Sequence, residues 1–368
     1  MKLMKDFSKK FTKKGGSFVP VQVVDLFCGV GGLTCGLIQA GLEVIAGFDI
    51  DPTCQYTYEH NNHIPYILHN IRDINGEEIN DLYDADAVKI LVGCAPCQPF
   101  SQMRFKMGQA NINDDKYNLL LEFGRLINET HPTIISMENV PQIRATGVYR
   151  EFIAILERNG YNYNSQVVYC PDYGIPQTRR RFVLVASQLG QIELIAPTHD
   201  PQNVHVRDFI ADLSALEAGE IDPNDPLHQS SALSPINLQR IRASIPGGTW
   251  RDWPDELRCA CHRKESGKTY ASVYGRMTWD QIGPTITTQF YNYGTGRFGH
   301  PEQDRALSLR EGAILQTFPQ DYAFIDPDRD FVIRDISRHI GNAVPVRLGE
   351  IIGLTILNHL QNHNILNI

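Results

Sequence analysis

A strand, a glycine-rich turn and a helix follow one another near the start of the chain, and this succession most constrains the fold. Residues 21–26 contain four apolar residues and are typical of a strand, and an apolar helical stretch reaches Leu37. The turn between them contains Gly29, Gly31 and Gly32, which let the backbone approach a ligand beside a helix N-terminus. Later apolar runs alternate with helical patterns and predict an α/β fold. These runs span residues 43–48, 87–92, 132–137, 163–169 and 182–186.

Two acidic residues lie at sequence positions from which they could bind a nucleotide-like ligand. Asp49 ends the second strand about 20 positions beyond the glycine turn, a spacing at which a carboxylate can hydrogen-bond a ribose diol. Asp73 and Ile74 close a third unit, the usual place for a side chain that reaches an adenine ring. Asp73 is equally suited to cap a helix or turn. The turn lacks the full Gly-x-Gly-x-x-Gly spacing, so the pattern favours an adenosine-containing cofactor over a dinucleotide.

A single cysteine between two prolines follows the strand at 87–92. Pro96 and Pro99 flank Cys97, and proline restricts the backbone to few conformations. The thiol is therefore held at the carboxyl end of a strand, where open α/β sheets bind ligands, and we interpret it as a nucleophile. Cys94 and Cys97 also match the Cys-x-x-Cys of thiol–disulfide oxidoreductases, a rival interpretation that gives the glycine turn no role.

Charged residues near the next strand ends are candidates for a catalytic acid and for a group that binds a phosphate or a base carbonyl. Glu138 ends the strand at 132–137 beside the Cys97 loop and is a candidate acid, the alternative being a satisfied strand-end residue. Arginines at 179–181 precede the strand at 182–186. Such a run is usually a solvated turn, but alternate arginines of an extended segment point the same way and can reach a phosphate or a base carbonyl.

The length of 368 residues predicts about two domains. We expect a flexible basic tail over 1–20, a catalytic and cofactor-binding domain over 21–190, a loop-rich second domain over 191–320 and a return to the first domain over 321–368. No apolar segment approaches the ~20 residues of a membrane span, and the lysine-rich N-terminus is unlike a signal peptide. Eight scattered cysteines fit reduced thiols in the cytoplasm.

The second domain differs from the rest of the chain in charge. The chain carries a net charge of −8, whereas residues 240–276 hold eight basic and four acidic residues, with Trp250 and Trp253 among the interleaved aromatics. This combination favours nucleic-acid contact. The basic residues expected to contact DNA are Arg240, Arg251, Arg258 and Arg276. Cys259, Cys261 and His262 stand close together, but no second Cys or His pair with zinc-ligand spacing follows, so we predict no metal site.

Five motifs occur in one order: Asp25-Leu-Phe-Cys-Gly-Val-Gly-Gly, Gly93-Cys-Ala-Pro-Cys-Gln-Pro-Phe-Ser101, Glu138-Asn-Val140, Gln177-Thr-Arg-Arg-Arg181 and Gly341-Asn-Ala-Val-Pro345. Together they resemble the DNA cytosine-5 methyltransferases, especially those of bacterial restriction–modification systems. The resemblance omits the basic tail and residues about 191–275, which in the family form the variable target-recognition region. It implies a Rossmann-like, S-adenosylmethionine-dependent methyltransferase sheet with a smaller, loop-rich target-recognition domain.

The resemblance also implies roles for the motif residues. Attack of the Cys97 thiolate on C6 of a cytosine activates C5, and Glu138 hydrogen-bonds N3 and the exocyclic amine. Arg179 and Arg181 orient the base and neutralise charge at its carbonyl. The methyl group comes from S-adenosylmethionine, and the cytosine must first be flipped out of the duplex. Gln98 and Ser101 resemble loop residues that close over the flipped base.

Cofactor contacts are carried over position by position onto the matching residues. They are Phe27, Gly29, Gly31, Asp49, Ile50, Asp73, Ile74, Pro96, Leu119 and Asn342. The sequence departs from the family at Gly283, because an arginine often precedes the Pro-x-x-Thr that begins here at Pro284. This departure leaves open how the recognition domain is anchored locally.

The expected partners are double-stranded DNA that contains the target cytosine and a restriction endonuclease of the same specificity, in a bacterial cytoplasm beside the nucleoid and without a membrane. A tRNA cytosine-5 methyltransferase is the alternative enzyme, since one branch of the family methylates tRNA. The long basic recognition segment favours DNA. A catalytically dead DNA-binding homologue is the non-enzymatic alternative, which the intact Cys97, Glu138, Arg179 and Arg181 disfavour.

Overall fold

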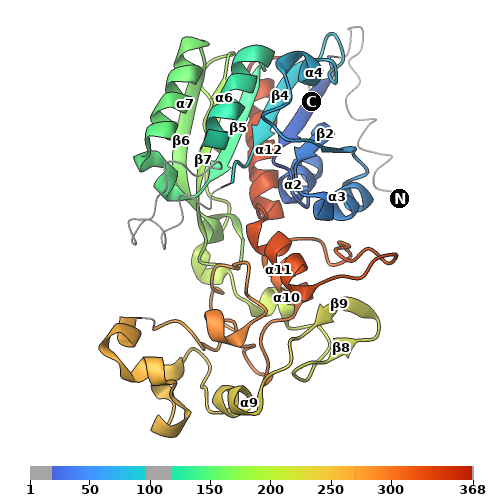
Figure 1. Cartoon of the computed structure of the whole chain (residues 1–368). Helices are drawn as coiled ribbons and strands as arrows, with labels where there is room; N and C mark the ends of the chain where they lie inside the picture. Colours follow the sequence, from blue (N-terminus) through green and yellow to red (C-terminus); the bar gives the residue numbers. More distant parts are fainter. Residues whose placement is uncertain (1–18, 97–117, 270, 367–368) are drawn as a thin grey trace. The chain divides into compact units, whose positions relative to one another are not determined.

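The computed structural model describes residues 19–96, 118–269 and 271–366. Packing divides the chain into two units, which Figure 1 draws in the colours of the sequence. Of the described residues, unit 1 comprises 19–96, 118–169, 180–196 and 344–366, and unit 2 comprises 170–179, 197–269 and 271–343. The chain therefore enters unit 2 twice before it returns to unit 1 at Val344.

A seven-stranded sheet forms the centre of unit 1, in the order β3-β2-β1-β4-β5-β7-β6. The pairs from β3 to β5 are parallel, and β7 is antiparallel to both β5 and β6. β1 and β5 are buried along their whole length, as expected for strands covered on both faces. The strands are β1 (Val21–Leu26), β2 (Glu43–Asp49), β3 (Tyr66–Leu68), β4 (Val88–Gly93), β5 (Ile134–Asn139), β6 (Asn162–Tyr169) and β7 (Arg180–Ser187).

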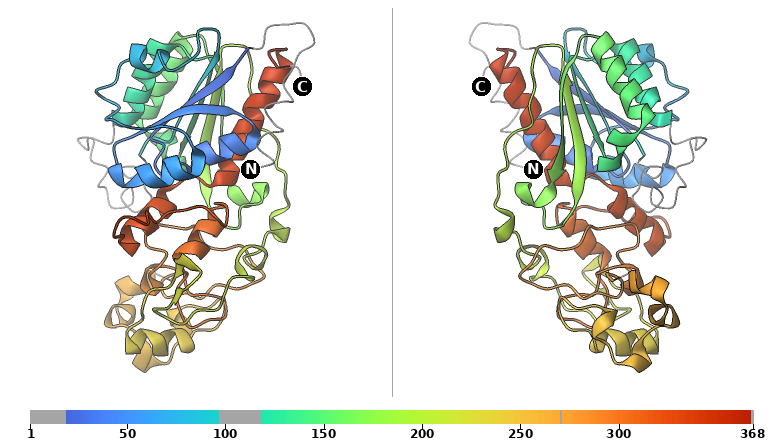
Figure 2. Two further views of the ribbon diagram at one scale, coloured as in Figure 1. Left: turned by 90° about the vertical axis from the view of Figure 1, so that its right-hand side faces the viewer. Right: turned by 90° about the vertical axis from the view of Figure 1, so that its left-hand side faces the viewer.

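Helices cover both faces of this sheet (Figure 2). α4, α6 and α7 pack together on one face, and α2 and α12 pack on the other. The core of the first face includes Leu91 and Ile135 from the sheet and Phe123 and Phe152 from the helices. The helices of unit 1 are α2 (Gly32–Ala40), α3 (Gln55–Asn62), α4 (Gly76–Asn80), α6 (Leu119–Thr130), α7 (Gly147–Arg158) and α12 (Val346–Asn362).

The contact between α2 and α12 depends on small residues. A Cβ on Gly36 would lie 2.2 Å from the Val346 carbonyl oxygen, and one on Gly349 would lie 2.8 Å from the Leu33 carbonyl oxygen. Glycine therefore lets the two helix backbones approach each other closely. α12 therefore lies in unit 1, and the chain re-enters this unit at Val344, whereas the predicted return began at residue 321.

Within the described part of the chain, residues 333–362 are the one stretch long and apolar enough to cross a membrane by composition. Its most apolar window is 67% buried inside the protein, which is the property of a core helix. Pro345 separates α11 from α12 within this stretch.

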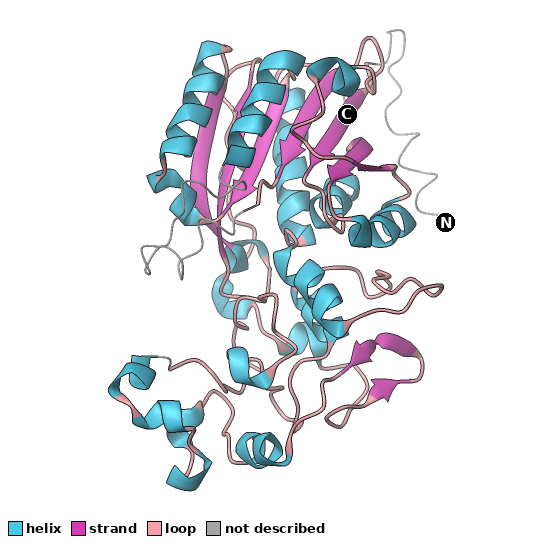
Figure 3. Cartoon of the chain, in the orientation of Figure 1, coloured by secondary structure: helices cyan, strands magenta, loops and turns pink. Residues whose placement is uncertain are grey.

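Unit 2 contains little regular structure, as the coil-rich lower part of Figure 3 shows. Its two short strands, β8 (Ile221–Asp222) and β9 (Asp225–Gln229), form a separate antiparallel pair. Many of its remaining residues lie in 3-10 turns and loops. Its helices are α8 (Arg207–Ile210), α9 (Pro235–Arg242), α10 (Leu309–Leu315) and α11 (Ile333–Asn342).

Buried polar side chains explain why residues 170–179 belong to unit 2. The Gln177 side chain is fully buried, donates to the Leu315 carbonyl oxygen at 2.9 Å and to Gln316 Oε1 at 2.7 Å, and accepts from the Ile286 N–H. Gln316 donates in turn to the carbonyl oxygens of Ile340 and Ala343. These bonds join four segments of unit 2, which comprises residues 170–179 and 197–343, whereas the predicted second domain spanned 191–320.

Backbone hydrogen bonds anchor the segment around Gly283 to residues 176–178. Its N–H donates to the Pro176 carbonyl oxygen at 3.0 Å, and its own carbonyl accepts from the Thr178 N–H at 2.9 Å. A Cβ at this position would lie 3.0 Å from the Pro176 oxygen, so a larger residue would crowd the bridge. Residues 281–288 form a loop with one isolated bridge at Gly283.

Candidate active site

The two central parallel strands of unit 1 end where the strand order reverses. β2 and β3 lie on one side of β1, and β4 and β5 lie on the other. The carboxyl ends of β1 and β4 therefore flank a topological switch point, the usual ligand site of an open α/β sheet. The glycine turn follows β1 and the Cys94–Pro96 segment follows β4, so both predicted ligand-binding segments lie at this edge.

The glycine turn and the end of β2 are joined through one carboxylate. Asp49 Oδ2 accepts from the Gly29 N–H at 2.9 Å, and Oδ1 accepts from the Ile50 and Asp51 N–H groups at 2.7 and 3.0 Å. Burial raises the pKa of Asp49, and the backbone hydrogen bonds oppose this shift. The carboxylate is thus fixed at the strand end before any ligand binds.

The space around this turn fits the adenosine end of the predicted cofactor. Gly29 has φ +51°, and a Cβ on it would meet no atom within 4 Å. Ile50, beside Asp49, is 65% exposed, so an apolar side chain lies open to a ligand. Phe27 has φ +60°, an uncommon conformation for a non-glycine residue that is often found at functional sites.

The other predicted cofactor residues have different environments. Asp73 is exposed, whereas Ile74 is buried and its carbonyl accepts from Arg125. Pro96 and Leu119 are half-buried in unit 1. Asn342 is exposed at the end of α11, in unit 2. Their contacts with a cofactor stay predictions.

Beneath the turn, the sequence analysis missed a buried acid. The Asp25 side chain is fully buried at the end of β1, and its Oδ2 accepts from the Thr34 hydroxyl at 2.7 Å. The Thr34 hydroxyl lies 3.1 Å from the Tyr58 hydroxyl. Burial raises the pKa of Asp25 to about 7, although the Thr34 hydrogen bond acts in the opposite direction. An acidic residue inside an otherwise apolar strand was the sequence signal for this network.

Glu138 forms the centre of the predicted catalytic group at the end of β5. Its side chain is 3% exposed, and Oε1 lies 2.8 Å from Arg181 Nε in an ion pair. The Cys94 thiol donates to Oε2 at 2.8 Å. The antiparallel pairing of β5 with β7 brings the arginine motif to this strand end. The structure therefore places Glu138 and Arg181 together.

Two neighbours of this group have roles that the sequence analysis did not assign. Cys94, interpreted above only through the Cys-x-x-Cys rival, holds the orientation of the Glu138 carboxylate through its thiol. The buried Asn139 side chain donates to the Ala95 carbonyl oxygen at 3.0 Å, which fixes the backbone directly before Pro96. The signal in the sequence was the position of Asn139 beside Glu138.

Arg179 belongs to unit 2 and is described there. Its side chain is 2% exposed, and it donates to the carbonyl oxygens of Ile286 at 3.0 Å and Ala343 at 3.3 Å. Its predicted action on the base stays a prediction. Cys97, Gln98 and Ser101 lie outside the described residues, and so does most of the basic tail.

The four arginines predicted to contact DNA differ in their contacts. Arg276 is 6% exposed, and its guanidinium donates to five backbone carbonyl oxygens and to Asp304. Arg240 donates to the Leu257 carbonyl oxygen and to Asn237, and Arg258 donates to the Arg251 carbonyl oxygen and pairs with Asp255. Arg251 is exposed, 5.8 Å above the Trp250 ring. This placement gives no support to a DNA contact by Arg276, and Arg251 is the one of the four that is exposed.

The tryptophans of this segment also differ from expectation. Trp250 and Trp253 are 4% and 2% exposed and form the core of unit 2 with Ile241, Tyr293 and Ala306. These two tryptophans therefore pack in a core, Trp250 stacked on His262 and Trp253 edge-on to Tyr274, and they do not form an exposed base-stacking surface.

Comparisons with known proteins agree with the geometry. Residues 21–358 match the family model described as C-5 cytosine-specific DNA methylase. The chain is 54% identical over 343 residues to the type II methylase M.HgiDII of Herpetosiphon aurantiacus, covering 92% of this chain and 96% of that protein. It is 30% identical over 359 residues to the type II methyltransferase M1.BsuMI of Bacillus subtilis, covering 91% and 80%. The crystal structure of a Spodoptera frugiperda DNMT2 mutant matches the fold with a TM-score of 0.62 at 17% identity, covering 91% of this chain and 99% of that one.

Proposed function

Because this chain belongs to the C-5 cytosine-specific DNA methylase family and is a DNA cytosine-5 methyltransferase, we propose that it methylates one cytosine within a specific duplex sequence as the modification enzyme of a type II restriction–modification system. The restriction–modification role rests on the type II names of its relatives. A restriction endonuclease of the same specificity is the implied functional partner, acting on the same DNA in the cytoplasm.

The observation that carries the proposed chemistry is the Glu138 group. A buried carboxylate is held by Arg181 on one oxygen and by the Cys94 thiol on the other, at the sheet edge from which the chain leads through Pro96 to Cys97. A carboxylate held in this way is oriented to hydrogen-bond N3 and the exocyclic amine of a cytosine ring.

The residues of this chain would act in the following order on a flipped-out cytosine. The Cys97 thiolate forms a bond to C6, and the displaced electron pair makes C5 nucleophilic while Glu138 hydrogen-bonds N3 and the exocyclic amine. Positive charge on Arg181 and Arg179 balances the charge that develops on the base. After C5 has gained the methyl group, loss of the C5 proton returns an electron pair to the ring and expels the Cys97 thiolate.

S-adenosylmethionine would supply the electrophilic methyl group. The residues that would hold it are Asp49 at the ribose, Ile50 beside the adenine and the turn Phe27–Gly31, which would contact both the adenine and the methionine parts. The fit rests on the fixed Asp49 carboxylate, the open face of Gly29 and the exposed Ile50 side chain.

The test is methyl transfer from labelled S-adenosylmethionine to duplex DNA or to tRNA, with bisulfite sequencing of DNA from cells that express the chain. We expect labelled duplex DNA and one modified cytosine per recognition sequence. Preferential labelling of tRNA, or the absence of modified cytosine in cellular DNA, would contradict the proposal.

Two cysteine variants separate the covalent mechanism from the thiol oxidoreductase rival. Cys97→Ser is expected to abolish methyl transfer, because a hydroxyl at this position is a far weaker nucleophile. Cys94→Ala removes one hydrogen bond to Glu138 and is expected to lower the rate by no more than about 10-fold, since such a bond contributes about 1 kcal/mol. An equal loss of methyl transfer in both variants would contradict the assignment of Cys97 as the nucleophile.

A further inference from the structure

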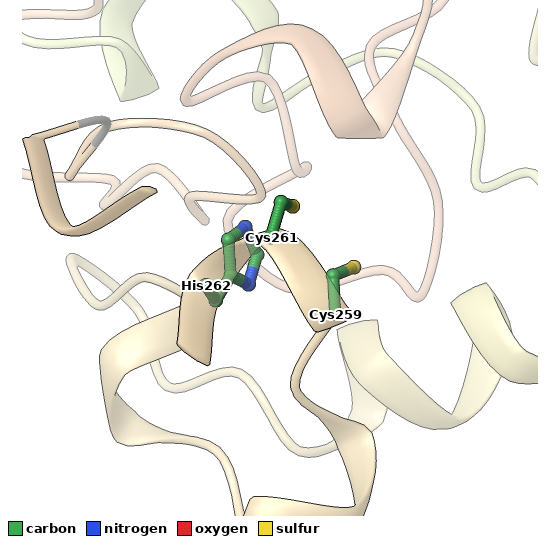
Figure 4. A group of neighbouring side chains, drawn as sticks. All are labelled: Cys259, Cys261 and His262. Atoms are coloured by element: carbon green, nitrogen blue, oxygen red, sulfur yellow. The ribbon is translucent and has the colours of Figure 1, made fainter. Parts of the chain in front are cut away.

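A short turn of unit 2 gathers two cysteines and a histidine. Cys259 directly precedes the 3-10 helix η9 (Ala260–Arg263), which contains Cys261 and His262. The two sulfur atoms and an imidazole nitrogen lie within 4.8 Å of one another, and Figure 4 shows the three side chains projecting from this one turn. We propose that Cys259, Cys261 and His262 bind one zinc ion, with a water molecule as the fourth ligand.

The imidazole is held in place before any metal binds. The His262 side chain is 5% exposed, and its ring stacks on Trp250 with centroids 4.1 Å apart and planes inclined by 16°. Trp253 and Tyr274 flank the ring at 6.3 and 5.8 Å. Three aromatic rings therefore fix the histidine, so that little conformational entropy is lost when it becomes a ligand.

The same histidine has an unsatisfied polar atom. Its Nδ1 is buried and meets no hydrogen-bond partner among the described residues. A buried polar atom without a partner costs about 1–3 kcal/mol, and surrounding core side chains offer it none. Metal coordination by this imidazole would give the buried ring a polar interaction.

The ligand set selects the metal. Two thiolates and an imidazole suit zinc and exclude the oxygen-seeking magnesium and calcium. Zn–S bonds of ~2.3 Å and Zn–N bonds of ~2.1 Å in a tetrahedron separate the ligand atoms by roughly 3.5–3.8 Å. The three atoms would therefore close in by about 1 Å, which rotation of the exposed Cys261 side chain can largely supply.

The charges around the turn are compatible with this ion. Arg258 adjoins Cys259 in the chain, and the Arg240 guanidinium lies 5.5 Å above the rings of Trp253 and Tyr274. Positive charge beside a thiol favours the thiolate. Two thiolates neutralise the charge of a zinc ion, so the complex places no additional net charge beside these arginines.

Zinc would stabilise a segment that has few other constraints. Residues 255–269 are described throughout and contain 3-10 turns without a strand or an α-helix. Gly267 folds back onto η9 so closely that a Cβ would lie 1.8 Å from the Cys261 carbonyl oxygen. An ion bound to η9 would fix the turn onto which residues 265–269 pack. It would order the basic segment without taking part in methyl transfer.

The test measures zinc in the full-length protein purified without chelators. We expect one zinc ion per chain by elemental analysis, and a cobalt-substituted protein with the absorption of tetrahedral thiolate coordination. Cys259→Ser, Cys261→Ser and His262→Gln are each expected to weaken zinc binding by more than ~100-fold, because even loss of a second-shell partner costs roughly 10–100-fold. Cys35→Ala, in α2 of unit 1, is the matched control that retains zinc.

Cys261→Ser keeps the test decisive, because this side chain is exposed and its loss does not disturb the aromatic core. Full zinc content in Cys261→Ser, or a zinc content of the parent protein far below one ion per chain, would overturn the proposal. A disulfide between Cys259 and Cys261 in the protein purified under reducing conditions would overturn it too.

Discussion

Different kinds of interaction stabilise the interior of each of the two units. Unit 1 packs apolar faces of helices against a sheet whose central strands are buried on both sides. Unit 2 has little sheet, and buried polar side chains such as Gln177, Arg276 and Arg305 bond its segments to one another. Apolar packing tolerates many sequences, whereas each buried polar side chain needs particular partners in a particular geometry.

The difference fits the work that we propose for each unit, which is chemistry in unit 1 and DNA recognition in unit 2. A sheet edge presents fixed groups such as Asp49 and Glu138 for chemistry common to the family. A unit built from turns can change its surface without changing a sheet, and recognition of different DNA sequences requires such change. The contrast predicts that substitutions in unit 1 act on chemistry, and that substitutions of buried polar groups in unit 2 act on stability.

The largest effect is expected from Glu138→Gln in unit 1. The amide cannot act as an acid and loses the charge that faces Arg181, so methyl transfer should fall by roughly 10²–10⁴-fold. Initial rates with labelled S-adenosylmethionine and duplex DNA measure it. Glu122→Gln is the matched control, since Glu122 pairs with Arg125 at the surface of α6, where loss of an ion pair costs at most about 1 kcal/mol. A Glu138→Gln rate within a few-fold of the parent would remove Glu138 from the mechanism.

In unit 2 the strongest expected loss of stability comes from Glu311→Gln. Glu311 accepts from Arg305 Nη1 and Nη2 at 2.8 and 2.7 Å, and both side chains are almost completely buried. Removing one partner of a buried pair typically costs about 3–5 kcal/mol. All three tryptophans, Trp250, Trp253 and Trp279, lie in unit 2, so urea unfolding followed by tryptophan fluorescence reports on this unit.

The control for that variant is Asp280→Asn, which breaks the exposed Arg207–Asp280 pair and should cost less than about 1 kcal/mol. If Glu311→Gln and Asp280→Asn shift the fluorescence midpoint equally, unit 2 does not depend on its buried ion pair and the contrast between the units fails.

Acidification should move the stability of the two units in opposite directions. Burial lowers the pKa of His300 to about 4, and Arg305 lowers the pKa of Glu311 to about 2 against the effect of burial. Both groups bind fewer protons when folded, so unit 2 loses stability as pH falls from 6.5 towards 2. Burial raises the pKa of Asp25 to about 7. Folded Asp25 therefore binds more protons, and its contribution to unit 1 is lost as pH rises from 3.8 to 7.

Tryptophan fluorescence measures the pH effect in unit 2, and hydrogen exchange of β1 and β4 peptides, corrected for the intrinsic rate, measures it in unit 1. Asp25→Asn removes the titrating group and should flatten the dependence in unit 1 alone. Stability that falls in both units between pH 6.5 and 5, with or without Asp25, would show that other groups dominate.

The same contrast explains what the sequence could predict. Strand, turn and helix at 21–40 and the helix at 346–362 follow from apolar periodicity, and the place of Glu138 at the sheet edge follows from its position at a strand end. The ion pair of Glu138 with Arg181 was not predicted, because it depends on β7 running antiparallel to β5. The environment of Gln177 could not be predicted, since its partners Leu315 and Gln316 lie about 140 positions away. Arg276 donates mainly to backbone carbonyl oxygens. Every residue has such an oxygen, so the amino-acid sequence does not indicate which residues are its partners.

The smallest expected effect tests whether an exposed arginine of unit 2 contacts the DNA backbone. Arg251→Ala should weaken binding to specific and non-specific duplexes alike. It should also make the plot of log K against log salt concentration less steep by about 0.9, the value for one phosphate contact. Arg242→Ala is the matched control, because it removes another exposed arginine of unit 2, which pairs with Asp304 and is not among the predicted DNA contacts. Salt titrations of DNA binding measure both slopes. An unchanged slope with a loss of discrimination between sequences would instead indicate that Arg251 contacts the edge of a base. In that case single exposed side chains of unit 2 would determine sequence specificity.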